Sequence, residues 1–249
     1  MSQMSSRFVW DDLSGLFATP RPKSARKYSE DQPRDDHGRW GSGGFTSSHE
    51  ATIALSHLVS DHTYVEDHPI AIAAATATHA VLAEMKIKGY AMPNSVDVHR
   101  ASGPAHGETA WYIPTEATVG NSQLKTKLRV MLPETIPTNV SLKDIVASTF
   151  GGTDPENGAV DKFTVRSVKD IVIHEMGHVL AGGRGSMAIP EDHPMARVNE
   201  DAARSVSRYA ARNQDEFLAE AFTRLYRGET LRPDAQRLYD RLNGPKVKP

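Results

Sequence analysis

Apolar residues recur at helical spacing around residues 168–181. A single stripe at i, i+4, i+8 and i+11 is formed by Val168, Val172, Met176 and Val179. Ser167 precedes this stripe and Asp170 follows three residues later, which is the pattern of an N-cap with an acidic third residue. Gly182 and Gly183 end it. The pattern predicts a helix with its stripe in the core and its opposite edge lining a cleft.

The rest of the chain predicts an α+β fold. Helical patterns cover residues 48–59, 69–88, 195–208, 214–227 and 233–243. Between residues 94 and 133 the period changes to two, which predicts three short strands around 96–98, 109–113 and 128–132. Residues 133–164 are interrupted by proline and glycine, so they are expected to be irregular. We therefore expect a small antiparallel or mixed sheet beside the 168–181 helix, followed by a C-terminal helical subdomain.

Composition divides the chain into an arm and a domain. The chain has 249 residues, of which 39% are hydrophobic, enough for a substantial core. Residues 1–48 are polar and charged with few apolar residues, so we expect a disordered or docking arm before a domain at 49–249. The formal net charge of -2 gives no sign of nucleic-acid binding. No signal peptide or membrane span is expected, which favours a cytoplasmic or virion-associated protein.

The predicted helix carries a metal-binding pattern. His174 and His178 lie four residues apart, so their side chains would share one helix face and could hold one metal ion. Glu175 lies beside them, which completes the H-E-x-x-H arrangement of zinc metallopeptidases. The alternative is a surface helix with two solvated histidines. The chain has no cysteine, which excludes thiolate zinc sites and cysteine nucleophiles.

A catalytic zinc site needs a third protein ligand. The extended pattern H-E-x-x-H-x-x-G-x-x-H is absent, because Ala181 and Arg184 occupy the required glycine and histidine positions. The ligand must come from farther along, and Glu216 on a following helix is the candidate. Secondary candidates in the intervening stretch are Glu191, Asp192 and His193.

The segment Tyr209 to Phe222 resembles the second metal-site helix of the gluzincin peptidases, the family that includes the anthrax lethal factor catalytic domain. It keeps the tyrosine seven residues before the glutamate and most of the following run, with Leu218 in place of the second aromatic residue. The resemblance covers about residues 165–225. It implies a zincin-like metallopeptidase fold in which Zn²⁺ is bound by three ligands: His174, His178 and Glu216.

The same resemblance implies roles for three further residues. Glu175 would be the general base, Tyr209 would donate a hydrogen bond to the oxyanion, and Glu220 would orient a histidine ligand. Each has an alternative. Glu216 could be only the capping partner of Asn213, Glu220 could pair with Arg224, and Tyr209 could only pack.

A second resemblance lies in the N-terminal arm. Residues 32–40, with the glycines that follow, are similar to a short element of bacteriophage head-associated proteins. The resemblance implies that the arm docks on phage head proteins. The alternative is a flexible polar linker.

Together these features predict a zinc-dependent endopeptidase that acts on a protein or peptide substrate and has no nucleic-acid or membrane partner. The strand at 128–132 is the candidate edge on which an extended substrate would add as a further strand. Two alternatives remain open. One is a phage head-associated structural protein with a non-catalytic zinc site, and the other is a toxin-like effector protease.

Overall fold

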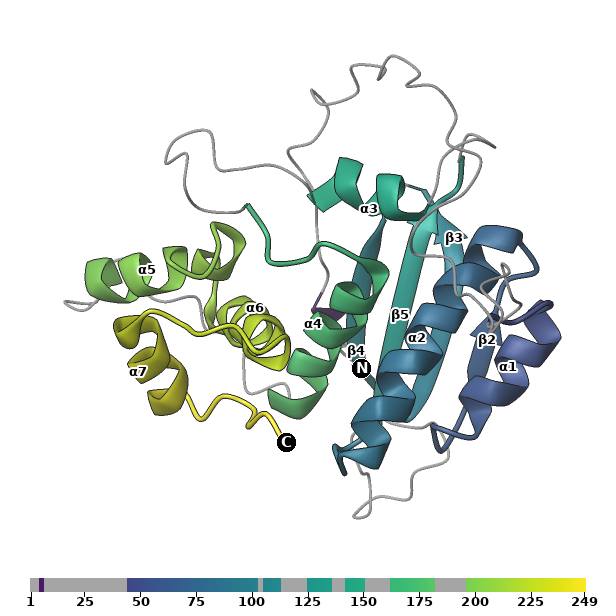
Figure 1. Cartoon of the computed structure of the whole chain (residues 1–249), viewed down its shortest axis with the longest axis horizontal. Helices are drawn as coiled ribbons and strands as arrows, with labels where there is room; N and C mark the ends of the chain where they lie inside the picture. Colours follow the sequence, from purple (N-terminus) through teal and green to yellow (C-terminus); the bar gives the residue numbers. More distant parts are fainter. Residues whose placement is uncertain are drawn as a thin grey trace, which may run out of the picture.

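The computed structural model describes seven parts of the chain: residues 5–6, 44–102, 105–112, 125–135, 142–150, 162–181 and 196–249. Most of the predicted arm at 1–48, including the phage-like element, lies outside these residues. The secondary ligand candidates Glu191, Asp192 and His193 also lie outside them. Within the described residues, seven α-helices and a small mixed sheet form the α+β arrangement that the sequence predicts (Figure 1).

The sheet is mixed, with the strand order β1–β4–β5–β3–β2. Strands β2 (Thr63–Val65), β3 (Ser95–Ala101) and β5 (Lys125–Pro133) run parallel to one another, whereas β4 (His106–Tyr112) is antiparallel to β5. A two-residue strand, β1 (Ser5–Ser6), pairs antiparallel with β4. Since β5 lies between β4 and β3, the prediction of a sheet edge at residues 128–132 is wrong.

Three helices cover one face of this sheet (Figure 1). They are α1 (Ser48–Ser56), α2 (Pro69–Ile87) and α4 (Val168–Ala181). By length and composition α2 could cross a membrane. Its apolar side, which includes Val81, Leu82 and Met85, is instead buried in the fold. The apolar composition of α2 is therefore explained by its place in the core.

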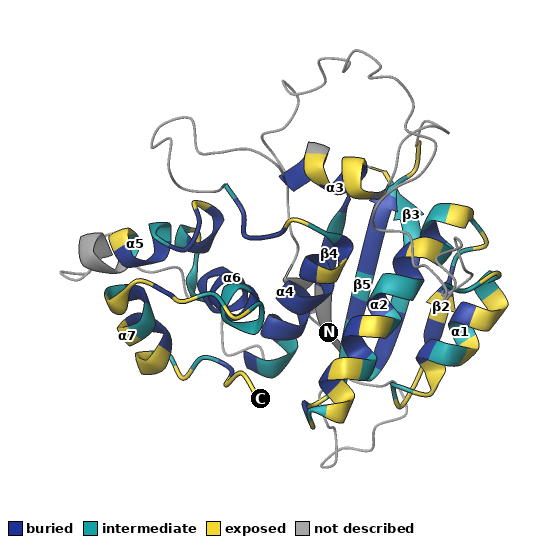
Figure 2. Ribbon diagram, in the orientation of Figure 1, coloured by how far each residue is buried: buried dark blue, intermediate teal, exposed yellow. Residues whose placement is uncertain are grey.

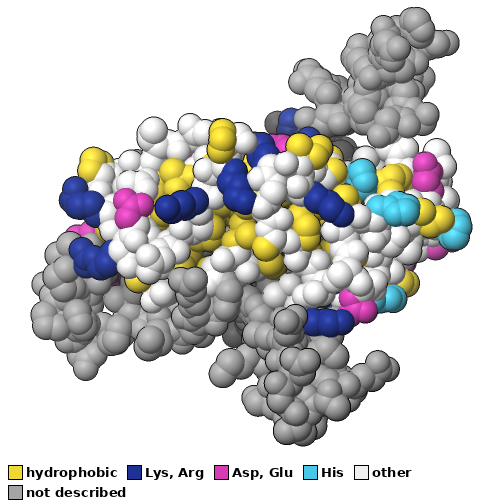
Figure 3. Space-filling model, turned by 90° about the horizontal axis from the view of Figure 1, so that it is seen from below, with side chains coloured by type: hydrophobic (Ala, Val, Ile, Leu, Met, Phe, Trp, Pro, Cys, Tyr) yellow, Lys and Arg dark blue, Asp and Glu magenta, His cyan; other side chains and the backbone are white. Residues whose placement is uncertain are grey.

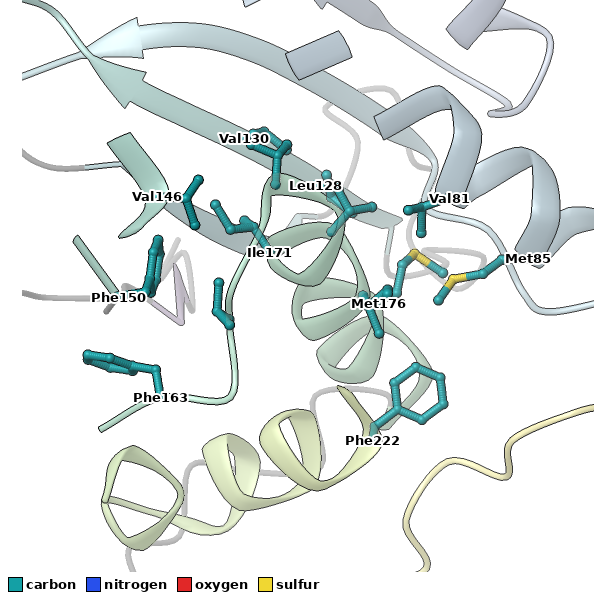
Figure 4. Close-up of a cluster of buried hydrophobic side chains, with 14 of the residues drawn as sticks. Val81, Met85, Leu128, Val130, Val146, Phe150, Phe163, Ile171, Met176 and Phe222 are labelled. Carbon is teal, nitrogen blue, oxygen red and sulfur yellow. The ribbon is translucent and has the colours of Figure 1, made fainter. Parts of the chain in front are cut away.

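Helix α4 lies at the centre of the molecule and is the most buried element in Figure 2. Figure 4 shows Ile171 and Met176 of α4 among apolar side chains of the surrounding elements, including Val130 of β5, Val81 of α2 and Phe222. Every residue from Asp170 to His178 is buried. The central helix of the core is therefore the helix that carries the H-E-x-x-H pattern.

The remaining helices follow the predicted order with one exception. Helix α5 (Ala196–Arg204), a 3-10 turn η1 (Tyr209–Ala211), α6 (Gln214–Tyr226) and α7 (Pro233–Arg241) form the C-terminal helical part. The exception is α3 (Leu142–Phe150), which lies where the sequence predicts irregular structure. Its apolar residues Ile145, Val146 and Phe150 are buried at helical spacing, so tertiary packing outweighs the proline and glycine on either side.

Candidate metal centre

The start of α4 is fixed by a reciprocal cap. The amide of Asp170 donates to Ser167 Oγ at 3.1 Å, and Asp170 Oδ2 accepts from the amide of Arg166 at 2.9 Å. The cap predicted from Ser167 is therefore confirmed. The cleft predicted for the histidine edge is not, because His174 and His178 are only 1% and 3% exposed. Both histidines lie inside the protein, on the side of α4 that faces α6.

Helix α6 approaches α4 closely because two small residues meet between them. A methyl group on Gly177 would lie 2.8 Å from the Cα of Ala219, which is closer than real contacts allow. Gly177 lies directly before His178, and Ala219 lies between Glu216 and Glu220. This crossing therefore sets the distance from which both glutamates reach the histidines.

Glu216 faces both histidines. Its Oε2 lies 3.2 Å from His174 Nε2 and 3.5 Å from His178 Nε2, and the two nitrogens are 3.2 Å apart. The amide of Glu216 also donates to Asn213 Oδ1 at 2.9 Å. Glu216 is therefore both the capping partner of Asn213, through its backbone amide, and a neighbour of the two histidines, through its side chain. The two predicted roles are compatible.

The three atoms fit a zinc ion. For metal–ligand bonds of about 2.0–2.2 Å at tetrahedral angles, ligand atoms lie about 3.3–3.6 Å apart. The observed separations of 3.2, 3.2 and 3.5 Å match one face of such a tetrahedron. Two imidazoles and a carboxylate are also a common donor set for zinc. Within the described part of the chain, these residues form the one His/Asp/Glu group with a geometry able to hold a metal.

Glu220 contacts the other nitrogen of one histidine. Its Oε1 lies 3.1 Å from His174 Nδ1, while its Oε2 accepts from the amide of Thr164 at 2.8 Å. The predicted alternative, an ion pair with Arg224, is wrong, because Arg224 bonds Glu229 at 2.9 Å. A carboxylate in this position would fix the ring with its Nε2 toward Glu216.

The charges of the cluster stabilise one another. Burial acts to lower the pKa of His174, but the hydrogen bonds and charges of Glu216 and Glu220 outweigh it and raise that pKa to about 10. Burial likewise acts to raise the pKa of Glu216, but His178 and His174 hold it well below its usual range. A positive charge at this place is therefore strongly favoured, and a metal ion would supply it in place of the proton.

Glu175 lies against β4, on the sheet side of α4. It is 2% exposed, and a methyl group on Gly107 would lie 2.5 Å from both its Cγ and its Oε1. Only a residue without a side chain leaves this room. Gly107 therefore allows the β4 backbone to pass directly beside the glutamate.

Tyr209 lies in η1, between the polypeptide before α4 and the start of α6. Its amide donates to the carbonyl of Lys162 at 3.1 Å, and its ring packs on Phe163 and lies 6.4 Å from the His174 ring. Burial, together with the nearby Glu216 carboxylate, raises the pKa of Tyr209 far above its usual value. The phenol therefore keeps its proton and can act as a hydrogen-bond donor.

The structure thus brings together His174, His178, Glu216 and Glu220, with Tyr209 beside His174, whereas Glu175 lies on the sheet side of α4. Three residues that shape this arrangement were missed by the sequence reasoning: Gly107, Gly177 and Ala219. Gly177 had a visible signal, since it lies inside the His-Glu-Met-Gly-His run. Gly107 had none, because its contact with Glu175 depends on how β4 and α4 pack.

The fold and the cluster define an α+β protein with a buried two-histidine, one-glutamate group suited to a metal ion. Comparison of the chain with protein-family models, curated proteins and solved structures found no match.

Proposed function

We propose that this protein is a zinc-dependent endopeptidase of the gluzincin type. The observation that carries the proposal is the triangle of His174, His178 and Glu216, whose edges match those of a tetrahedral zinc site. Glu175 and Tyr209 support it, because Glu175 follows His174 directly in α4 and the Tyr209 ring lies 6.4 Å from the His174 ring. A carboxylate and a protonated phenol are the two further groups that amide hydrolysis requires.

The three ligands would hold Zn²⁺, which supplies Lewis acidity and lowers the pKa of water. Glu175 accepts a proton from the attacking water and then delivers it to the amide nitrogen as the peptide bond breaks. The phenol of Tyr209 donates a hydrogen bond to the carbonyl oxygen as that oxygen gains negative charge. Glu220 and Thr164 keep the His174 ring in the orientation that presents Nε2.

Strand β4 is the natural place for the substrate. It passes beside Glu175 at Gly107, and apart from the short β1 it forms the outer side of the described sheet. An extended peptide that added to β4 would carry its scissile bond past Glu175. Apart from Thr109 and Ala110, which pair with β1, β4 is thus our candidate for the edge that the sequence analysis sought at β5.

The test compares wild type with Glu175→Gln on a denatured protein substrate with zinc present. The variant keeps the shape of the side chain, so it should bind zinc equally while cleavage falls by about 10²- to 10⁴-fold. Equal cleavage by the two proteins would remove the mechanism. Zinc binding must be counted as one tight site, because exposed histidines, among them His49, His57 and His62, could bind zinc weakly. Figure 3 shows several histidines near one another on the surface.

A structural zinc site is the second candidate function. It is favoured by the low exposure of the three ligand residues, which are 1%, 3% and 4% exposed, since structural zinc sites are closed. In that case removal of the metal by a chelator would lower the melting temperature strongly, and wild type would cleave no peptide substrate. Cleavage that disappears in Glu175→Gln would exclude this candidate.

A further inference from the structure

Strand β1 is a part of the fold that the proposed mechanism does not use. Its two residues pair antiparallel with β4, with Ser5 opposite Ala110 and Ser6 opposite Thr109. It is the last strand on that side of the described sheet. The N-terminal part of the chain therefore lies on the outer side of β4, where the proposed substrate would add.

The position of β1 matters because the described sheet has two edges, and it is the β4 side that passes Glu175. At the other edge, β2 is separated from β4 by β3 and β5. On the β4 side, Gly107 lies beside Glu175, and Thr109 follows two residues later, or about 7 Å along the strand. Since the pairing is antiparallel, β1 runs from Ser5 to Ser6 in the direction of Gly107.

The part of β4 that β1 leaves open near Glu175 is short. It consists of His106, Gly107 and Glu108, because the pairing with β1 begins at Thr109. Strand addition uses main-chain hydrogen bonds, so a peptide held along the whole strand needs the residues that β1 occupies. An extended substrate and β1 would therefore compete for β4.

Strand β1 is also short enough to be displaced. Its pairing rests on main-chain hydrogen bonds, which any extended peptide can make. It has two residues, whereas β4 has seven, so a longer peptide can form more hydrogen bonds with β4 than β1 does. Binding of such a peptide can thus compensate for the loss of β1.

We propose that the N-terminal segment inhibits the protein in cis by occupying the substrate edge of β4. Binding of an extended peptide along β4 requires β1 to leave. The proposal rests on the proposed function, and adds that the chain competes with its own substrate. A competitor of this kind raises KM by the reciprocal of the fraction of molecules whose edge is open, and it leaves kcat unchanged.

The alternative is that β1 only protects the edge of the sheet. The unpaired N–H and C=O groups of an edge strand promote aggregation, and a short covering strand is one way to prevent it. In that case release of β1 would favour aggregation and would leave KM unchanged. The KM of the full chain therefore separates the two roles.

The first experiment locks β1 onto β4. The chain has no cysteine, so two cysteines introduced at facing positions can form a single intramolecular disulfide. The two double variants are Ser6→Cys/Thr109→Cys and Ser5→Cys/Ala110→Cys. Both are made because facing pairs in an antiparallel ladder alternate between a closer and a wider spacing, and the closer pair suits a disulfide better.

The oxidised protein should cleave about 10-fold more slowly or less, since almost no molecule then has an open edge. A phosphine reductant should restore cleavage; thiols are avoided because they bind zinc. Both forms should bind one zinc ion equally, which shows that the centre is intact. Ser6→Cys alone is the control, and it should cleave equally with and without reductant.

The second experiment releases β1. Ser5→Pro/Ser6→Pro removes both main-chain N–H groups, and proline fits poorly in a paired strand. It should lower KM by about 5-fold or more with unchanged kcat, because the loss of two ordinary hydrogen bonds changes an equilibrium by about this factor. Ser5→Ala/Ser6→Ala keeps the main-chain pairing and is the matched control, with the KM of wild type.

A locked protein that cleaves as fast as its reduced form, or a proline variant with the KM of wild type, would overturn the proposal and leave the proposed function intact. Failure of both cysteine pairs to form a disulfide would also overturn it, because β1 would then not lie on β4. Absence of cleavage by wild type and by the proline variant alike would instead remove the proposed function itself.

Discussion

The contact between Gly107 and Glu175 gives the sharpest test of how the centre is built. Adding a methyl group at residue 107 places it 2.5 Å from Cγ and Oε1 and 2.8 Å from Cδ of Glu175. Contacts this short force the side chain or β4 to move, and such overpacking costs about 1–3 kcal/mol. For a chain of this size that corresponds to a fall in Tm of roughly 2–12 °C.

The cost should depend entirely on Glu175. Glu175→Ala removes all three atoms that the new methyl group would meet. In that background Gly107→Ala fills empty space and restricts the unfolded chain, so we expect it to be neutral or to stabilise by about 0.4–1 kcal/mol. The sign of the effect should therefore reverse between the two backgrounds.

The assay is a double-mutant cycle of the metal-free protein in denaturant, with wild type, both single variants and the double variant. A coupling free energy of at least about 1 kcal/mol is expected. If Gly107→Ala has the same effect in both backgrounds, to within about 0.5 kcal/mol, then β4 does not determine the position of Glu175.

Three further predictions concern other contacts. Gly177→Ala should destabilise the fold by about 1–3 kcal/mol and weaken zinc binding. The added methyl group would meet the backbone of Ala219, which cannot rotate away as a side chain can. Calorimetry measures the stability, and zinc titration measures the affinity. Tyr209→Phe should lower kcat by about 10²- to 10³-fold with unchanged zinc affinity, if its phenol stabilises the oxyanion; steady-state kinetics measure this. Glu66→Gln should cost about 1 kcal/mol at neutral pH, since the Glu66 carboxylate accepts from Arg100 Nε at 2.9 Å and from its amide at 2.6 Å.

The stabilisation by the contact between Glu66 and Arg100 should depend on pH. The hydrogen bonds from Arg100 hold the pKa of Glu66 below its usual value of 4.5. The stabilisation is therefore complete above about pH 4.5 and is lost as pH falls through the lowered pKa of the folded protein. Denaturation curves of wild type and Glu66→Gln should converge in acid, and a difference that stays constant would contradict this account.

The other two predictions also have outcomes that would contradict them. An unchanged kcat in Tyr209→Phe, or an unchanged zinc affinity in Gly177→Ala, would contradict the roles given to those residues.

The centre was largely predictable because its signals are local. The reciprocal cap of α4 and the four-residue spacing of its histidines depend only on the geometry of one helix. Glu216 could be located through its resemblance to a known helix, which the Asn213 cap supports as a helix start. Signals of this kind can be read from the sequence, because residues close in sequence have fixed relative positions in a helix.

The errors come from contacts between distant segments. The pattern of β5 fits an edge or an interior strand equally well, and only its pairing with both β3 and β4 decides between them. Strand β2 was missed because three residues are too short to show a period. The apolar stripe of α4 could not show that the opposite side is also buried, because that side is covered by α6, a later segment of the chain.

The depth of the centre has a kinetic consequence. An ion held by residues that lie between α4 and α6 has no direct route to solvent through their close contact at Gly177 and Ala219. Escape through that contact would require the two helices to separate, which is a local unfolding event. A rate of zinc removal that stops increasing once the chelator is in excess would show that the ion leaves by this route.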